Sequence, residues 1–396
     1  MLYFLLHQNK YNIKEDNLKI IIKSIHDKDN IYLSQSLLKY LNITKHNISK
    51  YGNEWDIYKK YTNPYEFIHT NIPYLNFSIS KYKPISRAFF KLVEIYNVFD
   101  IQNKFTKNIQ TFHLAEGPGG FIEATAKIRN NPNDIYYGMT LLNKKDNSIP
   151  GWKKSEKFLN NHKNVKLEYG ISQDGDLYNE LNFQYCVKKY KNSMNIITGD
   201  GGFDFSIDFN SQERSAVKII FIQTAYAIAL QKYGGCFILK IYDMFLKSTI
   251  DIIMLLSIFY KNVYITKPKT SRYANSEKYI VCCDFKYTNS GFILKKIFNI
   301  IKLLNNIDFT QNKIHSILNI PINLYLKHQL EEINAIFGQQ QIENISNTIK
   351  LIYNNDKKKD KLENIKSQNV QKCINWCIQN DIEYNKNSQY SNIFLN

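Results

Sequence analysis

Between residues 81 and about 290, short apolar runs alternate with longer stretches of helical periodicity. This alternation is typical of a largely parallel sheet that helices cover on both faces. The last two runs, "NVYITK" and "KYIVCCDF", lie close together and predict an antiparallel pair at one edge. We predict seven strands, at Thr111–Glu116, Ile135–Leu141, Val165–Tyr169, Met194–Thr198, Gly235–Ile241, Asn262–Thr266 and Lys278–Phe285. Helices are predicted around Arg87–Tyr96, Gly119–Arg129, Gln212–Lys232 and Lys247–Tyr260.

The two ends of the chain differ from this α/β domain and are predicted to be mainly helical extensions. They comprise residues 1–80 and 291–396, which leaves 81–290 as the domain itself. "DNLKIIIKSI" predicts a helix in the first extension, and "TNPYEFIHT" predicts a turn followed by an extended piece. "KLIYNNDKKKDKLENIKSQN" is a basic stretch of low complexity near residues 353–370, and it predicts a solvated linker or loop.

The composition indicates a globular chain with a polyanionic partner. The 396 residues are 44% hydrophobic, so a substantial core can form. The formal net charge of +17 favours nucleic acid as the partner. The alternative is compositional drift, because the chain is rich in Asn, Ile, Lys and Tyr, which an AT-rich genome tends to encode.

Cysteine usage and hydropathy predict a soluble intracellular protein. None of the six cysteines forms a CxxC motif, which suits free thiols in a reducing compartment. Cys373 and Cys377 are one helical turn apart, but no nearby His or Cys completes a zinc site, so we expect no metal. The start, "MLYFLLHQNKYN", does not have the pattern of a signal peptide. The longest apolar run, Thr249–Tyr260, is too short to span a bilayer.

A glycine-rich turn, Glu116–Gly120, joins a predicted strand to a predicted helix in "TFHLAEGPGGFIEATAKI". Such a turn brings backbone N–H groups close to a ligand. A dinucleotide fingerprint would require glycine where Ile122 stands and an acid after the next strand, which instead ends in Thr140 and Leu141. A P-loop is excluded because no GKS or GKT follows. S-adenosylmethionine (SAM) fits the turn, and the alternative is a turn that serves packing alone.

An acid-rich loop follows the third predicted strand, in "YGISQDGDLYNE". Asp174 and Asp176 lie there, at the edge where open α/β sheets bind ligands. Asp176 could accept a hydrogen bond from an adenine amino group. The alternative is that its carboxylate forms an Asx-turn or a helix N-cap.

Two lysines and two carboxylates converge on the same edge of the predicted sheet. Lys91 lies on an apolar helix, Asp200 ends the fourth strand, Lys240 lies near the end of an apolar strand, and Glu277 begins the last strand. Each has an ordinary alternative, such as a snorkelling lysine, a turn acid or an exposed charge. Taken together, the four side chains are predicted to form a catalytic set.

The block from about residue 81 to 286 resembles the FtsJ-type Rossmann-fold 2′-O-ribose methyltransferases, above all the cap-specific mRNA members of eukaryotes and large DNA viruses. The matching segments, in family order, are "SRAFFKL", "LAEGPGGFIEA", "YYGMTL", "DGDLYN", "GDGGFDF", "GGCFILKIYDMF" and "KPKTSRYANSEKYIVC". The two ends match only loosely, at "NPYEF" and "INWCI". The resemblance implies a Rossmann-like sheet of seven strands, mostly parallel with an antiparallel edge. It implies SAM contacts from Glu116, Gly117, Pro118, Gly119, Gly120, Phe121, Thr140, Asp176 and Asp200.

The family's Lys-Asp-Lys-Glu tetrad falls on Lys91, Asp200, Lys240 and Glu277. The implied reaction moves a methyl group from SAM to an RNA ribose 2′-hydroxyl, at the first transcribed nucleotide of capped mRNA (cap-0 to cap-1). Lys240 would be the general base, with its pKa pushed down by burial and by the Lys91 ammonium. Asp200 would orient Lys240, and Glu277 would hold Lys91 or the ribose.

The RNA is expected to bind at the same edge, where basic residues in the segments that flank the tetrad would contact its phosphates. The alternative is that these basic residues form only a solvated face. The expected contacts are Lys81, Lys83, Arg87, Lys267, Lys269, Ser271, Arg272, Asn275 and Lys278. Other capping or transcription proteins are candidate partners. The alternatives are a ribosomal- or transfer-RNA 2′-O-methyltransferase, or an RNA-binding or virion protein that keeps the fold without turnover. A viral chain would act in the host cytoplasm or viral factory and in the virion, and a cellular one in the nucleus.

Overall fold

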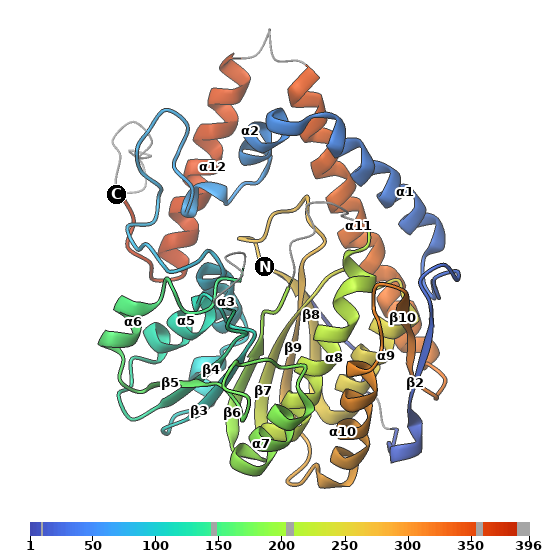
Figure 1. Cartoon of the computed structure of the whole chain (residues 1–396). Coiled ribbons are helices and arrows are strands. Elements are labelled where there is room, and N and C mark those ends of the chain that lie inside the picture. The colour runs from blue at the N-terminus through green and yellow to red at the C-terminus, as the bar shows by residue number, and fades with distance from the viewer. Residues whose placement is uncertain (9–10, 144–148, 203–209, 354–358, 386–396) are drawn as a thin grey trace.

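A central sheet of eight strands organises the computed structural model, which describes residues 1–8, 11–143, 149–202, 210–353 and 359–385 (Figure 1). The strands lie in the order β1-β8-β9-β7-β6-β3-β4-β5. Their bounds are β1 Leu2–Leu5, β3 Gln110–Leu114, β4 Ile135–Met139, β5 Val165–Glu168, β6 Met194–Gly199, β7 Gln231–Ile241, β8 Tyr260–Lys267 and β9 Lys278–Phe285. Strands β3 to β7 are parallel, and β9 runs antiparallel to both of its neighbours.

All seven predicted strands are present, and β8 and β9 form the predicted antiparallel pair. The outermost strand on that side is β1, because the first residues of the chain pair with β8 in antiparallel register, from Leu2 opposite Lys267 to Leu5 opposite Tyr264. The expected domain thus supplies the seven strands, and the N-terminal extension adds an eighth.

Helices cover both faces of the sheet, as the alternating pattern predicts. On one face, Ile196 and Ile238 pack with α3 (Ala88–Val98) and α5 (Gly120–Arg129). The neighbouring residues Ile197 and Leu239 point to the opposite face, because successive side chains of a strand alternate. The helices of that second face are α7 (Glu180–Tyr190), α8 (Gln212–Leu230), α9 (Lys247–Phe259) and α10 (Gly291–Asn305). Shorter helices are η1 (Glu15–Asn17), η2 (Asn47–Lys50), α4 (Ile101–Lys104) and α6 (Glu156–Asn161).

The helix predicted over "DNLKIIIKSI" is wrong, because this segment contains strand β2 (Leu18–Ser24). It pairs in antiparallel register with β10 (Asn312–Leu318), and the two strands form a separate small sheet. Along β2, the more buried and the exposed side chains alternate, which is the period of a strand. β-branched isoleucines favour this extended conformation.

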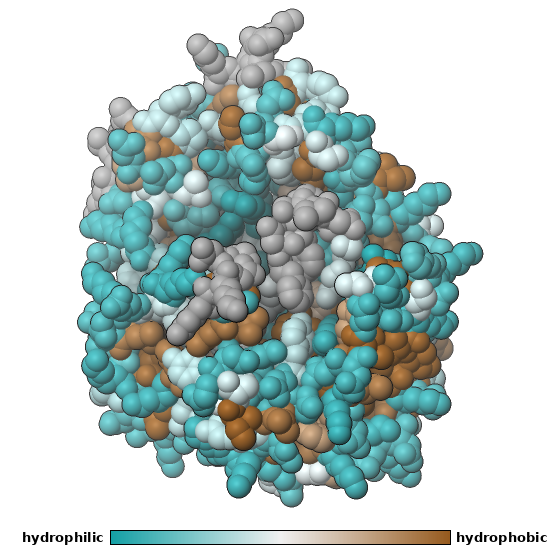
Figure 2. Space-filling model, in the orientation of Figure 1, coloured by the Kyte–Doolittle hydropathy of each residue, from teal (hydrophilic) through white to brown (hydrophobic). Residues whose placement is uncertain are grey.

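The remaining helices form a lobe above the carboxyl ends of the parallel strands (Figure 1). They are α1 (Gln35–His46), α2 (Gly52–Thr62), η3 (Glu66–Ile68), α11 (Leu324–Tyr353) and α12 (Lys359–Gln379). Figure 2 shows a hydrophilic hollow between this lobe and the sheet domain. The lobe combines the two extensions, because α11 packs against α1 and α2.

Two further sequence predictions are wrong in this lobe. The predicted linker is helical at residues 350–353, which end α11, and at 359–369, which belong to α12, whereas 354–358 lie outside the described residues. The segment predicted to be extended after Pro64 contains the helical turn η3. Long helices arise here because α12 buries Cys373, Trp376 and Cys377 against the α3 face of the core.

All six cysteines are free and buried, as predicted. Within the described ranges, the helices include none that is long and apolar enough to cross a bilayer. The same residues contain no cluster of three or more His, Cys, Asp or Glu side chains that could hold a metal ion.

Candidate active site

The glycine turn lies between β3 and α5, at the point where the order of the parallel strands reverses. From β3 the chain continues to β4 and β5 on one side, and it then crosses to β6 on the other. Ligands of open α/β sheets bind at such switch points. Gly119, with φ of 117°, precedes the first residue of α5, and a side chain is rarely tolerated in that conformation. The turn is therefore shaped for close approach of a ligand to backbone.

The Glu116 side chain stabilises the backbone that follows this turn. Its Oε1 atom accepts hydrogen bonds from the backbone N–H groups of Phe121 and Ile122, at 2.7 and 2.8 Å. Its Oε2 atom is buried and has no hydrogen-bond partner among the described residues. Burial raises the pKa of Glu116 well above its usual value, and the nearby Asp200 acts in the same direction. A buried carboxylate oxygen without a donor suits a cationic ligand group.

A cleft of about 730 Å³ opens beside the turn. This volume is within the ~300–1,000 Å³ that small-molecule sites typically occupy. The cleft extends from Gly117 and Thr140 past Asp176 to Asp200 and joins the tetrad at Lys240 and Glu277. Asp176 Oδ1 accepts a hydrogen bond from the Tyr178 backbone N–H at 2.9 Å, so Asp176 forms the Asx-turn that was the alternative interpretation. The same residue also lines the cleft.

The four predicted catalytic side chains form two ion pairs at the end of this cleft. Lys91 Nζ lies 2.8 Å from Glu277 Oε2, and Lys240 Nζ lies 3.3 Å from Asp200 Oδ1. Lys240 also donates to the backbone carbonyl of Asp200 at 2.6 Å. All four side chains are 9–16% exposed, so they are shielded but reachable from the cleft.

The two lysines differ in the direction of their pKa shifts. Burial would lower the pKa of Lys240, but the charge of Asp200 and the neighbouring Tyr242 and Glu277 raise it above its usual value. The predicted downward shift is therefore wrong for the protein without ligands. Burial lowers the pKa of Lys91, against the opposing charge of Glu277. The pKa of Glu277 is held well below its usual range by Lys91 and Lys240, despite burial.

Sequence reasoning missed three residues around the tetrad, Tyr279, Tyr242 and Glu66. The Tyr279 hydroxyl donates to Asp200 Oδ1 at 2.9 Å, and Tyr242 lines the cleft beside Lys240. Tyr279 and Tyr242 each follow a tetrad residue by two positions in an extended segment, so alternation on a strand could have identified them. No comparable signal marks Glu66, because its two partners are 21 and 206 positions away.

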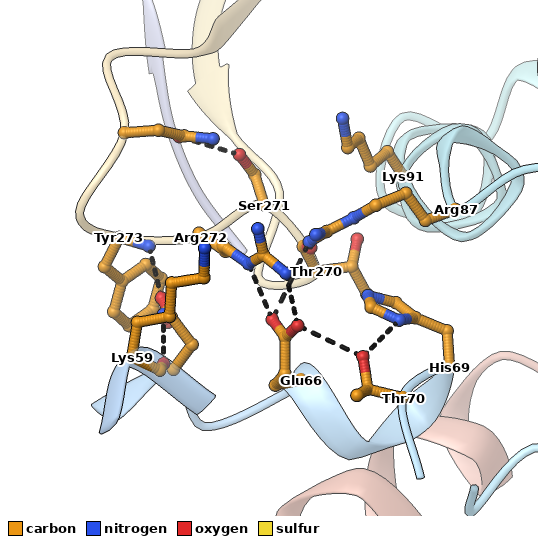
Figure 3. Close-up of polar contacts among 12 residues, drawn as sticks. Lys59, Glu66, His69, Thr70, Arg87, Lys91, Thr270, Ser271, Arg272 and Tyr273 are labelled. Carbon is orange, nitrogen blue, oxygen red and sulfur yellow. Dashed lines mark hydrogen bonds and ion pairs between the residues drawn. The ribbon is translucent and has the colours of Figure 1, made fainter. Parts of the chain in front are cut away.

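Glu66, in η3, binds two arginines that were expected to contact RNA (Figure 3). Arg272 donates to both carboxylate oxygens, at 2.9 and 2.5 Å, and Arg87 Nη2 lies 3.9 Å away. Arg87 immediately precedes α3, the helix that carries Lys91, and the Lys91 side chain points away from Glu66 in Figure 3. Both arginine side chains are about 30% exposed, so the N-terminal extension positions two cations beside the tetrad.

The other expected RNA contacts divide into accessible and buried groups. In the first group, Lys83 bonds to Ser78 and the Lys269 ammonium lies 5.7 Å from the Tyr65 ring. In the second group, Ser271 is only 1% exposed and donates to Glu277 Oε1 at 2.8 Å. The expectation that Lys267 and Lys278 contact phosphates is wrong, because these residues are only 6% and 4% exposed.

Both buried lysines hold protein oxygens instead. Lys267 Nζ donates to the carbonyl and side-chain oxygens of Asn275, at 2.7 and 2.9 Å, and to the carbonyl of Glu277 at 2.8 Å. Lys278 pairs with Asp243, which also binds Lys45 of the N-terminal extension. The loop before β9 is thereby held rigidly on its buried side.

The strand order, the glycine turn at the switch point and the cofactor-sized cleft define a Rossmann-like α/β fold with a ligand cleft at the edge where such sheets bind cofactors. Residues 84–285, just over half of the chain, match the FtsJ-like methyltransferase family, and the chain belongs to that family.

Curated relatives include cap-specific mRNA (nucleoside-2′-O-)-methyltransferases 1. The Leishmania braziliensis protein is 34% identical over 193 residues, which cover 46% of each chain. The Trypanosoma brucei protein is 37% identical over 119 residues, which cover 30% of this chain and 32% of that protein. A "probable methyltransferase" of African swine fever virus is 29% identical over 298 residues, or 68% of this chain and 66% of the viral one. The chain spans less than half the length of the first two proteins.

Proposed function

We propose that this protein transfers a methyl group from SAM to the ribose 2′-hydroxyl of the first transcribed nucleotide of capped mRNA. The observation that carries the proposal is the convergence of two lysine–carboxylate pairs at the end of a cofactor-sized cleft. The names of the curated relatives, cap-specific mRNA 2′-O-methyltransferases, support the choice of RNA.

The residues of the cleft fit SAM. The Glu116 Oε2 atom, which has no partner among the described residues, suits the amino group of the methionine part, and the next residue, Gly117, lines the cleft. A Cβ atom on Gly117 would lie 2.9 Å from Thr140 Oγ1 and 2.8 Å from the Gly151 carbonyl. Asp176, farther along the cleft, suits the adenosine part. When bound there, SAM would supply the methyl group.

Lys240 is positioned to take the proton of the ribose hydroxyl, which is a poor nucleophile while protonated. It must first be neutral, and Asp200 opposes this because it raises the pKa of Lys240. Lys91 and Glu277 form the opposite side of the site, where the ion pair fixes both groups. Much of the rate would come from holding the hydroxyl and the methyl carbon in line.

Methyl transfer to short capped RNA tests the proposal. Lys240→Ala should abolish transfer while SAM binding, measured by calorimetry, survives, and wild-type transfer should become faster as pH rises because Lys240 must lose a proton. Lys232→Ala is the matched control, because Lys232 is an exposed lysine at the other end of β7. Retained turnover by Lys240→Ala would refute the assignment, and activity confined to uncapped structured RNA would refute the choice of substrate.

A further inference from the structure

The loop that follows β5 forms one end of the cofactor cleft, where residues 175–178 line it. Hydrogen bonds fix the backbone of this loop. Asp174 Oδ1 accepts from the backbone N–H of Asp176 at 3.0 Å, and Asn182 Nδ2 donates to the Asp176 carbonyl at 2.9 Å. Further contacts reach the loop at Tyr178 and come from parts of the chain outside it.

Lys218, on α8, contacts the loop through the Tyr178 ring. Its ammonium lies 4.5 Å from the centroid of this ring, within the ~6 Å over which a cation is attracted to an aromatic face. Lys218 is partly buried, and removal of water strengthens such a contact. The next residue along α8, Ile219, lines the cleft. Lys218 therefore lies beside the cleft wall and holds a side chain that belongs to it.

The Lys218 ammonium also contacts the C-terminal extension. It lies 4.6 Å from the centroid of the Phe309 ring and donates to the Leu304 carbonyl at 3.3 Å. Asn305, at the end of α10, donates directly to the Tyr178 carbonyl at 2.7 Å. Phe309, Leu304 and Asn305 all lie beyond the segment that matches the FtsJ-like family. Lys218 thus connects the cofactor loop to a part of the chain outside that segment.

The charge of Lys218 also acts on Asp176, which lines the same end of the cleft. Burial raises the pKa of Asp176, and the Lys218 ammonium acts in the opposite direction. Burial lowers the pKa of Lys218, and Asp176 in turn acts to raise it. Each group therefore favours the charged form of the other. An ionised Asp176 is the stronger hydrogen-bond acceptor for an amino or hydroxyl group of a ligand.

We infer that Lys218 is a positioning residue for the adenosine part of SAM, and that it acts through Tyr178 and Asp176. Phe309 and Leu304 hold its ammonium in place, so the C-terminal extension contributes to the affinity for the cofactor. The inference rests on the function proposed above, because that function supplies the ligand.

Lys218→Met removes the charge and keeps an unbranched side chain. Lys218→Arg is the conservative variant, because a guanidinium keeps the charge and also stacks on aromatic rings. Lys295→Met is the matched control, because Lys295 is an exposed lysine of α10 that does not line the cleft. Calorimetry measures Kd for SAM and for 5′-methylthioadenosine, which has the adenosine part without the amino acid. Steady-state kinetics on capped RNA measure KM for SAM and kcat, and thermal unfolding verifies that each variant is folded.

Lys218→Met should raise Kd for both ligands and KM for SAM about tenfold, while kcat at saturating SAM is unchanged. Lys218→Arg should restore most of the affinity, and Lys295→Met should match wild type. This separation of KM from kcat identifies a positioning residue, because a general loss of structure would lower kcat as well. A wild-type Kd in Lys218→Met, or weaker binding of SAM with unchanged binding of 5′-methylthioadenosine, would overturn the inference.

Phe309→Leu tests the contribution of the C-terminal extension. It should raise Kd for SAM about threefold in the wild-type background and have no effect beside Lys218→Met, because the ring acts through that ammonium. The same fold-change in both backgrounds would overturn the connection to the extension. None of the Kd measurements uses RNA. If wild type binds SAM without methylating capped RNA, the proposed function fails while the Kd comparison still decides the role of Lys218.

Discussion

Replacement of Glu66 by glutamine should destabilise the protein in a pH-dependent manner. The carboxylate is 1% exposed and binds Arg272 through both oxygens, with Arg87 close by. Glutamine keeps the shape of the side chain but removes the negative charge that lies between the two guanidinium groups. The change therefore isolates the electrostatic part of this contact.

The pKa of Glu66 gives the magnitude. Burial would raise this pKa, but Arg272 and Arg87 lower it from 4.5 to about 2. A difference of about 2.5 units corresponds to about 3 kcal/mol of stability at pH 7, at 1.36 kcal/mol per unit. Because the folded-state pKa is depressed, this stabilisation is complete above pH 4.5 and is lost as pH falls towards 2. It should be roughly half as large at pH 3.

The assay is denaturant unfolding of wild type and Glu66→Gln between pH 7 and pH 3. The variant should be less stable by about 3 kcal/mol at pH 7, and the difference should shrink as pH falls. Glu54→Gln on exposed helix surface is the control and should change stability by less than about 0.5 kcal/mol. Equal stability at pH 7, or a difference that does not depend on pH, would refute the electrostatic explanation.

Two other substitutions test individual contacts of the site. Lys267→Met removes three hydrogen bonds, to Asn275 and Glu277, that hold the loop before β9. Steady-state kinetics should show kcat lowered at least tenfold, and calorimetry should show an unchanged Kd for SAM. A wild-type kcat would contradict this role of Lys267. Glu116→Gln keeps an acceptor for Phe121 and Ile122 but cannot ionise when a cationic group binds beside it. We therefore expect SAM to bind about 10–100-fold more weakly by calorimetry, and wild-type affinity would contradict a role in holding the amino group.

The sheet and the tetrad could be predicted because both depend on local pattern. Alternating apolar runs specify strands, and the carboxyl ends of parallel strands meet at one edge, so Asp200 and Lys240 had to converge. β2 could not be predicted in this way, because its partner β10 lies almost 300 residues later. The triplet Ile20–Ile22 alone fits either a helix or a strand.

Which lysines and arginines are accessible could not be predicted, because the sequence shows where the charges are but not which of them are buried. Lys278 follows Glu277 directly and Lys267 precedes it by 10 positions, but both lysines stabilise the loop from its buried side. Arg87 and Arg272 stay partly accessible, and it is Glu66, from the N-terminal extension, that fixes where their charges point. The same extension supplies Lys45, which pairs with the buried Asp243 beside Lys278. Since these contacts all lie outside the tetrad and the cofactor cleft, a change in the extension would leave the proposed methyl-transfer residues in place. Under the proposed function, we therefore expect the choice of RNA to depend on the lobe and the chemistry to depend on the sheet.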